Sequence, residues 1–444
     1  GKNTLKAVTT ANFLTAVGSG AGADNTTGSE LVAVGRNALT ANTTGDSNTA
    51  VGMRALDANT TASNNTAVGA DALGANTTGA GNTAVGTIAL DAITTSSNNT
   101  AVGHEALTNM TGGGGNTALG KSTMSAVVTG SNNTAVGYTA LSANTTASNN
   151  VAVGHNALVA NTTGATNTAV GQATMAANTT GTNNTAVGNL ALGTNTTTNN
   201  NTAVGVSALQ SNSAGSENQA FGTFALTSNT TGGNNTAVGY NSLGAVTTGD
   251  NNVALGMRAG QSVTTGGRNT CIGEGSGIAG SPSGAITTAS NIMCLGDDAL
   301  QTLFCTQGTI NTSDVRDKRN ITDFSNGLDW INKMKPVTYQ WDRRSWYVDK
   351  DASAEDILAV KTDGSLTKPK VEVGLIAQDV LEIEKEHGFG SNNDNSLLVN
   401  LTEDETRYGI NYTNIVPMLI KAVQELSAQV EELKTQPKCK CNEE

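Results

Sequence analysis

Small apolar, large apolar and amide side chains recur along the first two-thirds of this chain with a period of 17 residues. Sixteen glycines, from Gly18 to Gly273, keep this spacing without an insertion or deletion, and most close a Thr-Ala-Val-Gly tetrad. Apolar and polar residues alternate over the tetrad, which predicts a short β-strand. A unit this short cannot bury a core alone, so successive units must stack as coils of a parallel β-solenoid.

Two further positions of the unit carry structural information. Leu or Met lies four residues after most of the glycines, and Asn lies four residues before the glycine in fourteen consecutive units, from Asn48 to Asn269. Stacked Asn side chains can form a hydrogen-bonded ladder along the axis. One large apolar side chain per coil is a thin core, so we expect neighbouring chains around a shared axis to supply the missing burial. At ~4.8 Å per coil, the sixteen coils predict a rod of roughly 75 Å.

Asn-Thr-Thr triplets such as Asn42-Thr43-Thr44 recur between the strands and are interpreted as outer turns. They also match the Asn-x-Thr acceptor of N-glycosylation, which only a eukaryotic secretory route uses. A flat Thr array would favour ice binding, but adjacent Thr residues point to opposite faces of a strand. The period fails after Gly273, and the next similar unit, Cys294-Leu295-Gly296, follows 23 residues later. Such an atypical coil predicts a cap on the stack.

Composition divides the chain near residue 300. Residues 1–300 hold 7 Lys/Arg and 12 Asp/Glu, whereas residues 301–444 hold 17 and 24, together with all three Trp. Neither part is basic, so we expect no binding to nucleic acid. No apolar run approaches ~20 residues, so we expect no membrane insertion. The predicted domains are a shaft, 1–300, a junction with a candidate cleavage site, 301–312, and a C-terminal domain, 313–444.

Cysteines and histidines give little sign of a metal site. Cys271 and Cys294 occupy the slot that elsewhere holds the strand Ala, which predicts small buried side chains. No cysteine pair has zinc-ligand spacing, and His387 is interpreted as a surface-loop residue. We therefore expect no metal and no cofactor.

The end of the chain predicts oligomerisation through a helix. Apolar residues are spaced alternately by four and three over 412–433, which is a heptad seam. Its members are Tyr412, Val416, Leu419, Val423, Leu426, Val430 and Leu433. We expect a short coiled coil that assembles together with the body of its domain.

Five C-terminal segments carry a family resemblance. They are Ser313-Asp314-Val315-Arg316-Asp317-Lys318-Arg319-Asn320-Ile321, Leu328-Asp329-Trp330-Ile331, Lys335-Pro336-Val337-Thr338-Tyr339-Gln340-Trp341, Val373-Gly374-Leu375-Ile376-Ala377-Gln378-Asp379-Val380, and Asn411-Tyr412-Thr413-Asn414-Ile415-Val416-Pro417-Met418-Leu419-Ile420-Lys421-Ala422-Val423-Gln424-Glu425-Leu426. In this order they resemble the intramolecular chaperone domain of phage endosialidases, tail spikes and tail fibres. The resemblance implies a trimerisation chaperone of α+β fold that releases itself by autoproteolysis.

The same resemblance assigns site residues. It makes Ser313 the nucleophile and Lys318 its base, with Arg316, Asn320 and Gln378 in supporting positions. The scissile bond is then Thr312–Ser313, or the one after Ser313, before Asp314.

The implied chemistry has a physical requirement. A Ser hydroxyl needs a neighbouring base, and Lys acts as one only if burial or nearby cations lower its pKa from ~10.4 toward 7–8. A separation of five does not align two side chains on one helix face, so a turn must lie between Ser313 and Lys318. Taken alone, these residues also fit a Ser-Asp helix N-cap followed by solvated Lys and Arg.

The sequence thus predicts a mainly β protein: a β-solenoid or β-roll shaft that resembles trimeric autotransporter adhesin heads, followed by an α+β chaperone. The predicted function is a homotrimeric viral tail fibre or spike. It would be assembled in the host cytoplasm, attached to other virion tail proteins at its N-terminus, and directed to a host surface receptor such as a glycan. The alternative is a trimeric cell-surface adhesin or ice-binding solenoid whose C-terminal domain does not cleave.

Overall fold

The computed structural model describes residues 1–297, 318–349, 352–402 and 407–435. The chain divides into two compact units. The first, the shaft, comprises Gly1–Ser276 and Thr287–Leu295, and the second, the C-terminal unit, comprises Gly277–Ile286 and Gly296–Glu444. Residues 298–317 lie outside the described part and include Thr312, Ser313, Asp314 and Arg316.

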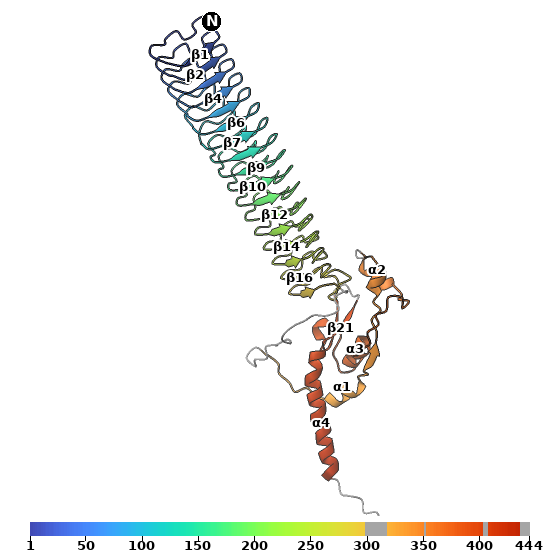
Figure 1. Cartoon of the computed structure of the whole chain (residues 1–444). Helices are drawn as coiled ribbons and strands as arrows, with labels where there is room; N and C mark the ends of the chain where they lie inside the picture. Colours follow the sequence, from blue (N-terminus) through green and yellow to red (C-terminus); the bar gives the residue numbers. More distant parts are fainter. Residues whose placement is uncertain (298–317, 350–351, 403–406, 436–444) are drawn as a thin grey trace, which may run out of the picture. The chain divides into compact units, whose positions relative to one another are not determined.

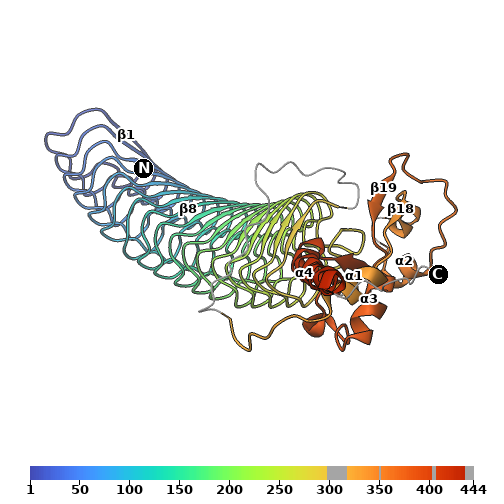
Figure 2. The same ribbon diagram turned by 90° about the horizontal axis from the view of Figure 1, so that it is seen from below.

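The shaft is a stack of parallel strands. Strand β1 spans Leu14–Val17, β2 spans Leu31–Val34, and each later strand has three residues. Their bounds are β3 Thr49–Val51, β4 Thr66–Val68, β5 Thr83–Val85, β6 Thr100–Val102, β7 Thr117–Leu119, β8 Thr134–Val136, β9 Val151–Val153, β10 Thr168–Val170, β11 Thr185–Val187, β12 Thr202–Val204, β13 Gln219–Phe221, β14 Thr236–Val238, β15 Val253–Leu255, β16 Thr270–Ile272 and β17 Met293–Leu295. Figures 1 and 2 show the coils following one another in chain order.

Each strand pairs in parallel with the next at the same repeat position. Ala50 lies opposite Ala67, and at the far end Cys271 lies opposite Cys294. The 17-residue coil and the terminal coil after a longer connection are thereby confirmed. Both cysteines are buried, as predicted, and burial raises the pKa of the Cys271 thiol to about 12.

The core of the shaft corrects one expectation. The aligned Leu and Met side chains, for example Leu56 and Met124, are fully buried within a single chain. Each lies at a left-handed position, with φ of 51° at both Leu56 and Met124, which turns the side chain inward against the buried strand alanines. This conformation costs roughly 1–2 kcal/mol, and burying a Leu or Met contributes about 1.5–3 kcal/mol. The shaft therefore needs no neighbouring chain to bury its Leu stripe.

The repeat glycines combine a positive φ with a close approach between coils. At Gly137 φ is 132°, and a Cβ added there would lie 2.6 Å from the carbonyl oxygen of Gly154 in the next coil. The repeat glycines from Gly18 to Gly256 share this environment, so glycine is required there both for its positive φ and for the close approach.

The asparagines four residues before the glycines form the predicted ladder. The backbone N–H of Asn65 donates to Oδ1 of Asn48 at 3.0 Å, and Nδ2 of Asn65 donates to the carbonyl of Gly79 at 2.9 Å. Asn65 thus joins the coils on both sides of its own. These amides are buried, and their hydrogen bonds offset the loss of contact with water.

The Asn-Thr-Thr triplets lie at bends of the coil, as predicted, but their Asn side chains point inward and form a second ladder. Asn42 is fully buried, and its Nδ2 donates to Oδ1 of Asn25 at 2.8 Å. The next residue, Thr43, donates its hydroxyl to the carbonyl of Thr60, and only the second Thr of the triplet is exposed. The Asn therefore faces the interior, where it is inaccessible to a glycosylating enzyme.

The second ladder is divided into blocks. Ile93, Met110 and Val127 replace Asn in three successive coils, and Val246 and Val263 replace it in two later ones. Oδ1 of Asn76 and of Asn229, each the last amide before an apolar block, has no hydrogen-bond partner. A block boundary therefore leaves one buried acceptor unsatisfied.

The C-terminal unit is α+β. Its elements are α1 Gly327–Lys333, β18 Val337–Tyr339, η2 Arg344–Tyr347, α2 Ala354–Ala359, β19 Glu372–Gly374, α3 Ala377–Glu386, η3 Asn393–Asn395, β20 Val399–Leu401, β21 Tyr408–Ile410, η4 Tyr412–Asn414 and α4 Ile415–Thr435. Strand β18 pairs with β19 and β20 with β21, both antiparallel. The fold class predicted from the sequence is confirmed for both units.

Candidate functional site

Segments far apart in the sequence meet in the core of the C-terminal unit. Trp330 of α1 is 1% exposed and packs in one cluster with Val380 and Ile383 of α3, Leu398 and Val399 of the β20 region, and Met418 of α4. Trp330, Val380 and Met418 lie in or next to three of the segments that carry the family resemblance. The structure thus gives these segments a shared packing role.

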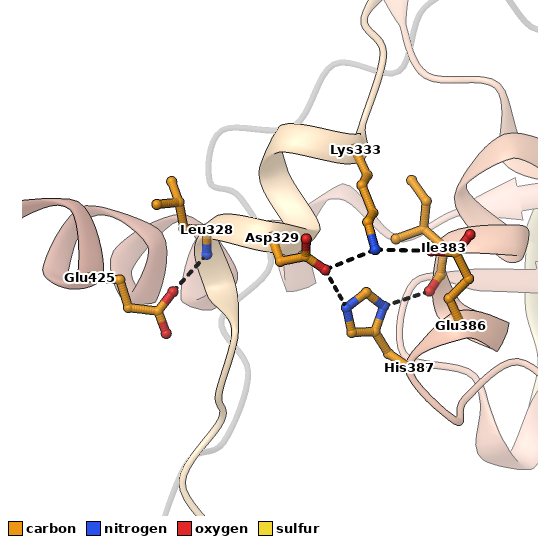
Figure 3. A network of polar contacts seen from close by, with 7 residues as sticks. All are labelled: Leu328, Asp329, Lys333, Ile383, Glu386, His387 and Glu425. Carbon is orange, nitrogen blue, oxygen red and sulfur yellow. Dashed lines mark hydrogen bonds and ion pairs between the residues drawn. The ribbon is translucent and has the colours of Figure 1, made fainter. Parts of the chain in front are cut away.

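Helices α1 and α4 approach each other at a glycine. A Cβ added to Gly327 would lie 2.7 Å from the backbone nitrogen of Ala422, so no larger residue fits here without displacing α4. Directly beside it, the N–H of Leu328 donates to Oε2 of Glu425 at 2.8 Å (Figure 3). Glu425 thereby satisfies one of the N–H groups that the first turn of α1 leaves without an intrahelical acceptor.

A second contact ties the end of β19 to the segment before α4. The N–H of Leu375 donates to the Tyr412 hydroxyl at 2.9 Å, and a Cβ at Gly374 would lie 2.8 Å from the same oxygen. Tyr412 belongs to the 3₁₀ turn η4, and α4 begins only at Ile415. The predicted coiled coil 412–433 is corrected accordingly, because Tyr412 hydrogen-bonds to its own unit and lies outside the long helix.

His387 is wrongly interpreted as a surface-loop residue. Its side chain is 13% exposed, and its ring lies 4.3 Å from the Trp330 ring, centroid to centroid. Nδ1 lies 2.8 Å from the carbonyl oxygen of Ile383, and Nε2 lies 3.0 Å from Oδ2 of Asp329 (Figure 3). The ring therefore connects α3 to α1.

Asp329 is the centre of this polar network. Lys333 contacts its carboxylate at 2.9 Å and also lies 3.0 Å from Glu386 (Figure 3). The hydrogen bond from Lys333, followed by that from His387, holds the pKa of Asp329 below its ordinary value. Because the network is largely exposed, its role is to fix the orientation of α1 and α3 more than to add stability.

A buried carboxylate orders the loop before β20. Glu384 of α3 is fully buried and accepts hydrogen bonds from the N–H groups of Leu397 and Leu398 and from the hydroxyl of Ser396. The sequence gives no signal for this role, because Glu384 lies in a helix rich in exposed acidic residues. The sequence gives no signal for the role of Glu425 either, because it is one of several acidic residues in α4.

The six predicted seam residues other than Tyr412 share one face of α4 and are exposed. We define the seam as Val416, Leu419, Val423, Leu426, Val430 and Leu433, which are between 42% and 65% exposed. Met418, Ala422 and Glu425 form a different stripe, rotated by roughly a third of a turn, which faces α1 and the core. Helix α4 is therefore anchored along one stripe and presents a separate apolar stripe to solvent.

The predicted catalytic residues are only partly described. Ser313, Thr312, Asp314 and Arg316 lie outside the described residues. Lys318 and Asn320 are exposed in the irregular segment 318–326, which precedes α1.

The third supporting residue, Gln378, is exposed in the first turn of α3. The proposed Ser313–Lys318 pair and the roles of Arg316, Asn320 and Gln378 remain predictions.

No helix in the described ranges is long and apolar enough to cross a membrane. Across the same ranges, no group of three or more His, Cys, Asp or Glu side chains is arranged to hold a metal ion.

Comparison with known proteins identifies part of the C-terminal unit. The family model for the chaperone of endosialidase matches residues 313–389. This span begins at Ser313, contains α1 to α3, and ends before β20 and α4. No curated protein and no solved structure matches the chain. Residues 313–389 are thus similar to the endosialidase chaperone family and follow a β-solenoid shaft in the same chain.

Proposed function

We propose that the C-terminal unit is an intramolecular chaperone that trimerises the chain, brings its shafts into register and then releases them by cleavage beside Ser313. The shaft would then serve as a viral tail fibre or spike for host attachment, joined to other virion tail proteins at its N-terminal end. The match to the endosialidase chaperone family supports the chaperone role. The exposed seam of α4 is the observation that carries it.

The seam supports association because it is apolar, continuous and separate from the stripe that anchors α4. Burying a half-exposed Val or Leu contributes roughly 1 kcal/mol, and six such residues recur on every copy. Val occupies one seam position and Leu the other in each heptad, a pattern that favours two strands in an isolated parallel coiled coil. Three copies are implied by the family resemblance. Contacts elsewhere in the C-terminal unit would therefore have to favour a trimer over a dimer.

Association would also supply what the proposed cleavage lacks. Lys318 is exposed in one chain, whereas a Lys acts as a base toward Ser where burial or nearby cations lower its pKa. In the proposed reaction the Ser313 hydroxyl transfers its proton to Lys318 and its oxygen attacks the scissile carbonyl. The peptide C–N bond then breaks as Lys318 gives that proton to the leaving amine. Water then hydrolyses the resulting ester. Burial of Lys318 between assembled chains would lower its pKa, so cleavage would report correct assembly.

Light scattering on the full-length protein tests the association. Val423→Asp puts a charge in the seam and should lower the mass from that of a trimer to that of a monomer. Gln424→Asp introduces the same charge on an exposed residue outside the seam and should leave the trimer intact. A trimer that survives Val423→Asp would exclude the seam as the contact, and a wild-type dimer would contradict the proposed copy number.

Denaturing electrophoresis tests the cleavage. The unmodified protein should give fragments of about 312 and 132 residues, whereas Ser313→Ala and Lys318→Ala should stay whole. An intact wild-type band from a protein that is trimeric by light scattering would instead favour the non-cleaving adhesin or ice-binding solenoid.

A further inference from the structure

The shaft has one sheet face that its own chain leaves uncovered. In each strand from β3 to β17 the middle residue is buried in the coil, and the residues on either side of it point outward, as Thr168 and Val170 do in β10. We call this surface the outer face. It runs across all 17 strands, which form one parallel sheet. Parallel sheets in proteins are generally covered on both faces, so an uncovered one requires an explanation.

The outer face carries no charged side chain. Its two columns, which flank the buried middle residue in strands β1 to β17, are built from Thr, Val, Leu, Ile, Phe, Met and Gln. Charged residues do occur elsewhere on the coils, for example Arg54 and Asp71 in the turns after the glycines. Proteins usually place charges on an exposed β surface to prevent association, and this surface has none.

Its apolar character increases toward the end of the shaft. Phe221, Leu255 and Ile272 replace the usual Val and are 38–50% exposed, and Val253 and Met293 replace the usual Thr. These residues lie in β13 to β17, the last five strands of the shaft. Clusters of exposed large apolar residues generally mark an interaction surface.

We propose that copies of this chain meet through their outer faces, around a common axis, with the apolar end over β13 to β17 as the anchor. The inference rests on the proposed function, because α4 is what brings the copies together. The Leu stripe is internal and contributes nothing between chains, so another surface must hold the shafts together once the C-terminal unit is released.

Shape and size favour a second copy as the partner. Every copy has the same two columns at the same spacing, so the rows of one face can fit between the rows of the next. Seventeen strands at ~4.8 Å, with a width of ~10 Å, give a face of roughly 800 Å², about what each partner of a stable protein complex buries.

Photo-crosslinking of the full-length protein tests the inference. A benzophenone-bearing residue in place of Val170 should join one copy to another, whereas the same residue in place of the exposed Thr163, on the triplet turn, should not. In parallel, Val153→Glu/Val170→Glu/Val187→Glu should lower the melting temperature of the assembled shaft by several degrees. The matched triple variant Thr146→Glu/Thr163→Glu/Thr180→Glu should not. Circular dichroism of both triple variants verifies that the coils are folded.

The outcomes separate this inference from the proposed function. A trimer that gives no product between copies at position 170 overturns the outer-face contact and leaves α4 association standing. A product within one chain, to residues 318–435, also overturns it, because the C-terminal unit would then cover the face. Thermal hysteresis of freezing without a crosslink between copies would assign the face to ice. A monomeric wild-type protein would contradict both proposals.

Discussion

The N–H of Leu328 in α1 donates to the carboxylate of Glu425 in α4 at 2.8 Å. This bond lies where Gly327 lets the two helices approach closely, and it sets the rotation of α4 about its own axis. The seam faces solvent because Glu425, Ala422 and Met418 occupy the stripe that faces the unit. The orientation of the proposed association surface therefore depends on a polar residue that lies outside the heptad seam.

Replacing Glu425 tests this relationship. Glu425→Ala leaves the Leu328 N–H without its acceptor, and we expect a loss of about 1–2 kcal/mol in the unfolding free energy of the C-terminal unit. Glu425→Gln retains a carbonyl oxygen and should lose less. Glu432→Ala, on an exposed residue of the same helix, is the control. Urea unfolding followed by Trp fluorescence measures the change, because all three Trp lie in this unit.

The repeat glycines are expected to be intolerant of even one methyl group. Gly137→Ala would place a Cβ 2.6 Å from the carbonyl of Gly154 and would force Ala to adopt φ of 132°, so we expect a loss of several kcal/mol. Gly112 lacks the unusual φ, and the nearest atom to its Cβ lies 3.4 Å away on Thr129. Gly112→Ala should therefore unfold at nearly the wild-type temperature by calorimetry. Equal melting temperatures for the two variants would contradict the role assigned to the repeat glycine.

The second amide ladder predicts a difference between two identical substitutions. In the wild-type protein, Oδ1 of Asn161 accepts from Asn178 at 2.8 Å. Asn178→Val, inside a block of amides, therefore leaves this buried Oδ1 without a donor. Asn229→Val, at the end of a block, likewise leaves Oδ1 of Asn212 without a donor, but it also removes the Oδ1 of Asn229, which is already unsatisfied. We expect Asn178→Val to be the more destabilising by about 1–3 kcal/mol, the cost of one extra buried unsatisfied acceptor. Calorimetric unfolding of the two variants, compared side by side, gives the difference.

The Asp329 network predicts a pH dependence. Its partners lower the pKa of Asp329 in the folded state, so its stabilising contribution is present above the ordinary value of about 3.9 and is lost as the pH falls through the lowered folded value. Asp329→Asn should therefore flatten the acid limb of the stability curve of the C-terminal unit below about pH 4. Unfolding midpoints across that range test this. If the stability of the variant falls with decreasing pH as steeply as that of the wild type, the titration of Asp329 does not contribute to the pH dependence.

The periodic part of the fold was predictable because each coil repeats the same local problem. The glycine spacing determined the strand register, and the Asn four residues before each glycine determined the first ladder. The second ladder was predictable in principle, since Asn42 and its equivalents share the period. Its direction was not, because an Asn-Thr-Thr triplet suits a turn whether the amide points inward or outward.

The candidate site was predictable only as a set of motifs. The segments around Trp330 and Val380 pack together as their shared resemblance suggests, and the apolar seam follows from heptad spacing alone. Glu384 accepts from a group 13 residues away, His387 contacts Asp329 58 residues away, and Glu425 accepts from a group 97 residues away, and no local pattern encodes such contacts.

By itself, the sequence determined the 17-residue coil, the α+β character of the C-terminal unit and the apolar face of its last helix, because each is a periodic or local property. Only the tertiary structure decided that the Leu stripe is buried within one chain. A left-handed backbone at every Leu turns that side chain inward, and the stacking of coils holds it there. Burial is a property of the stack, and no single repeat contains it.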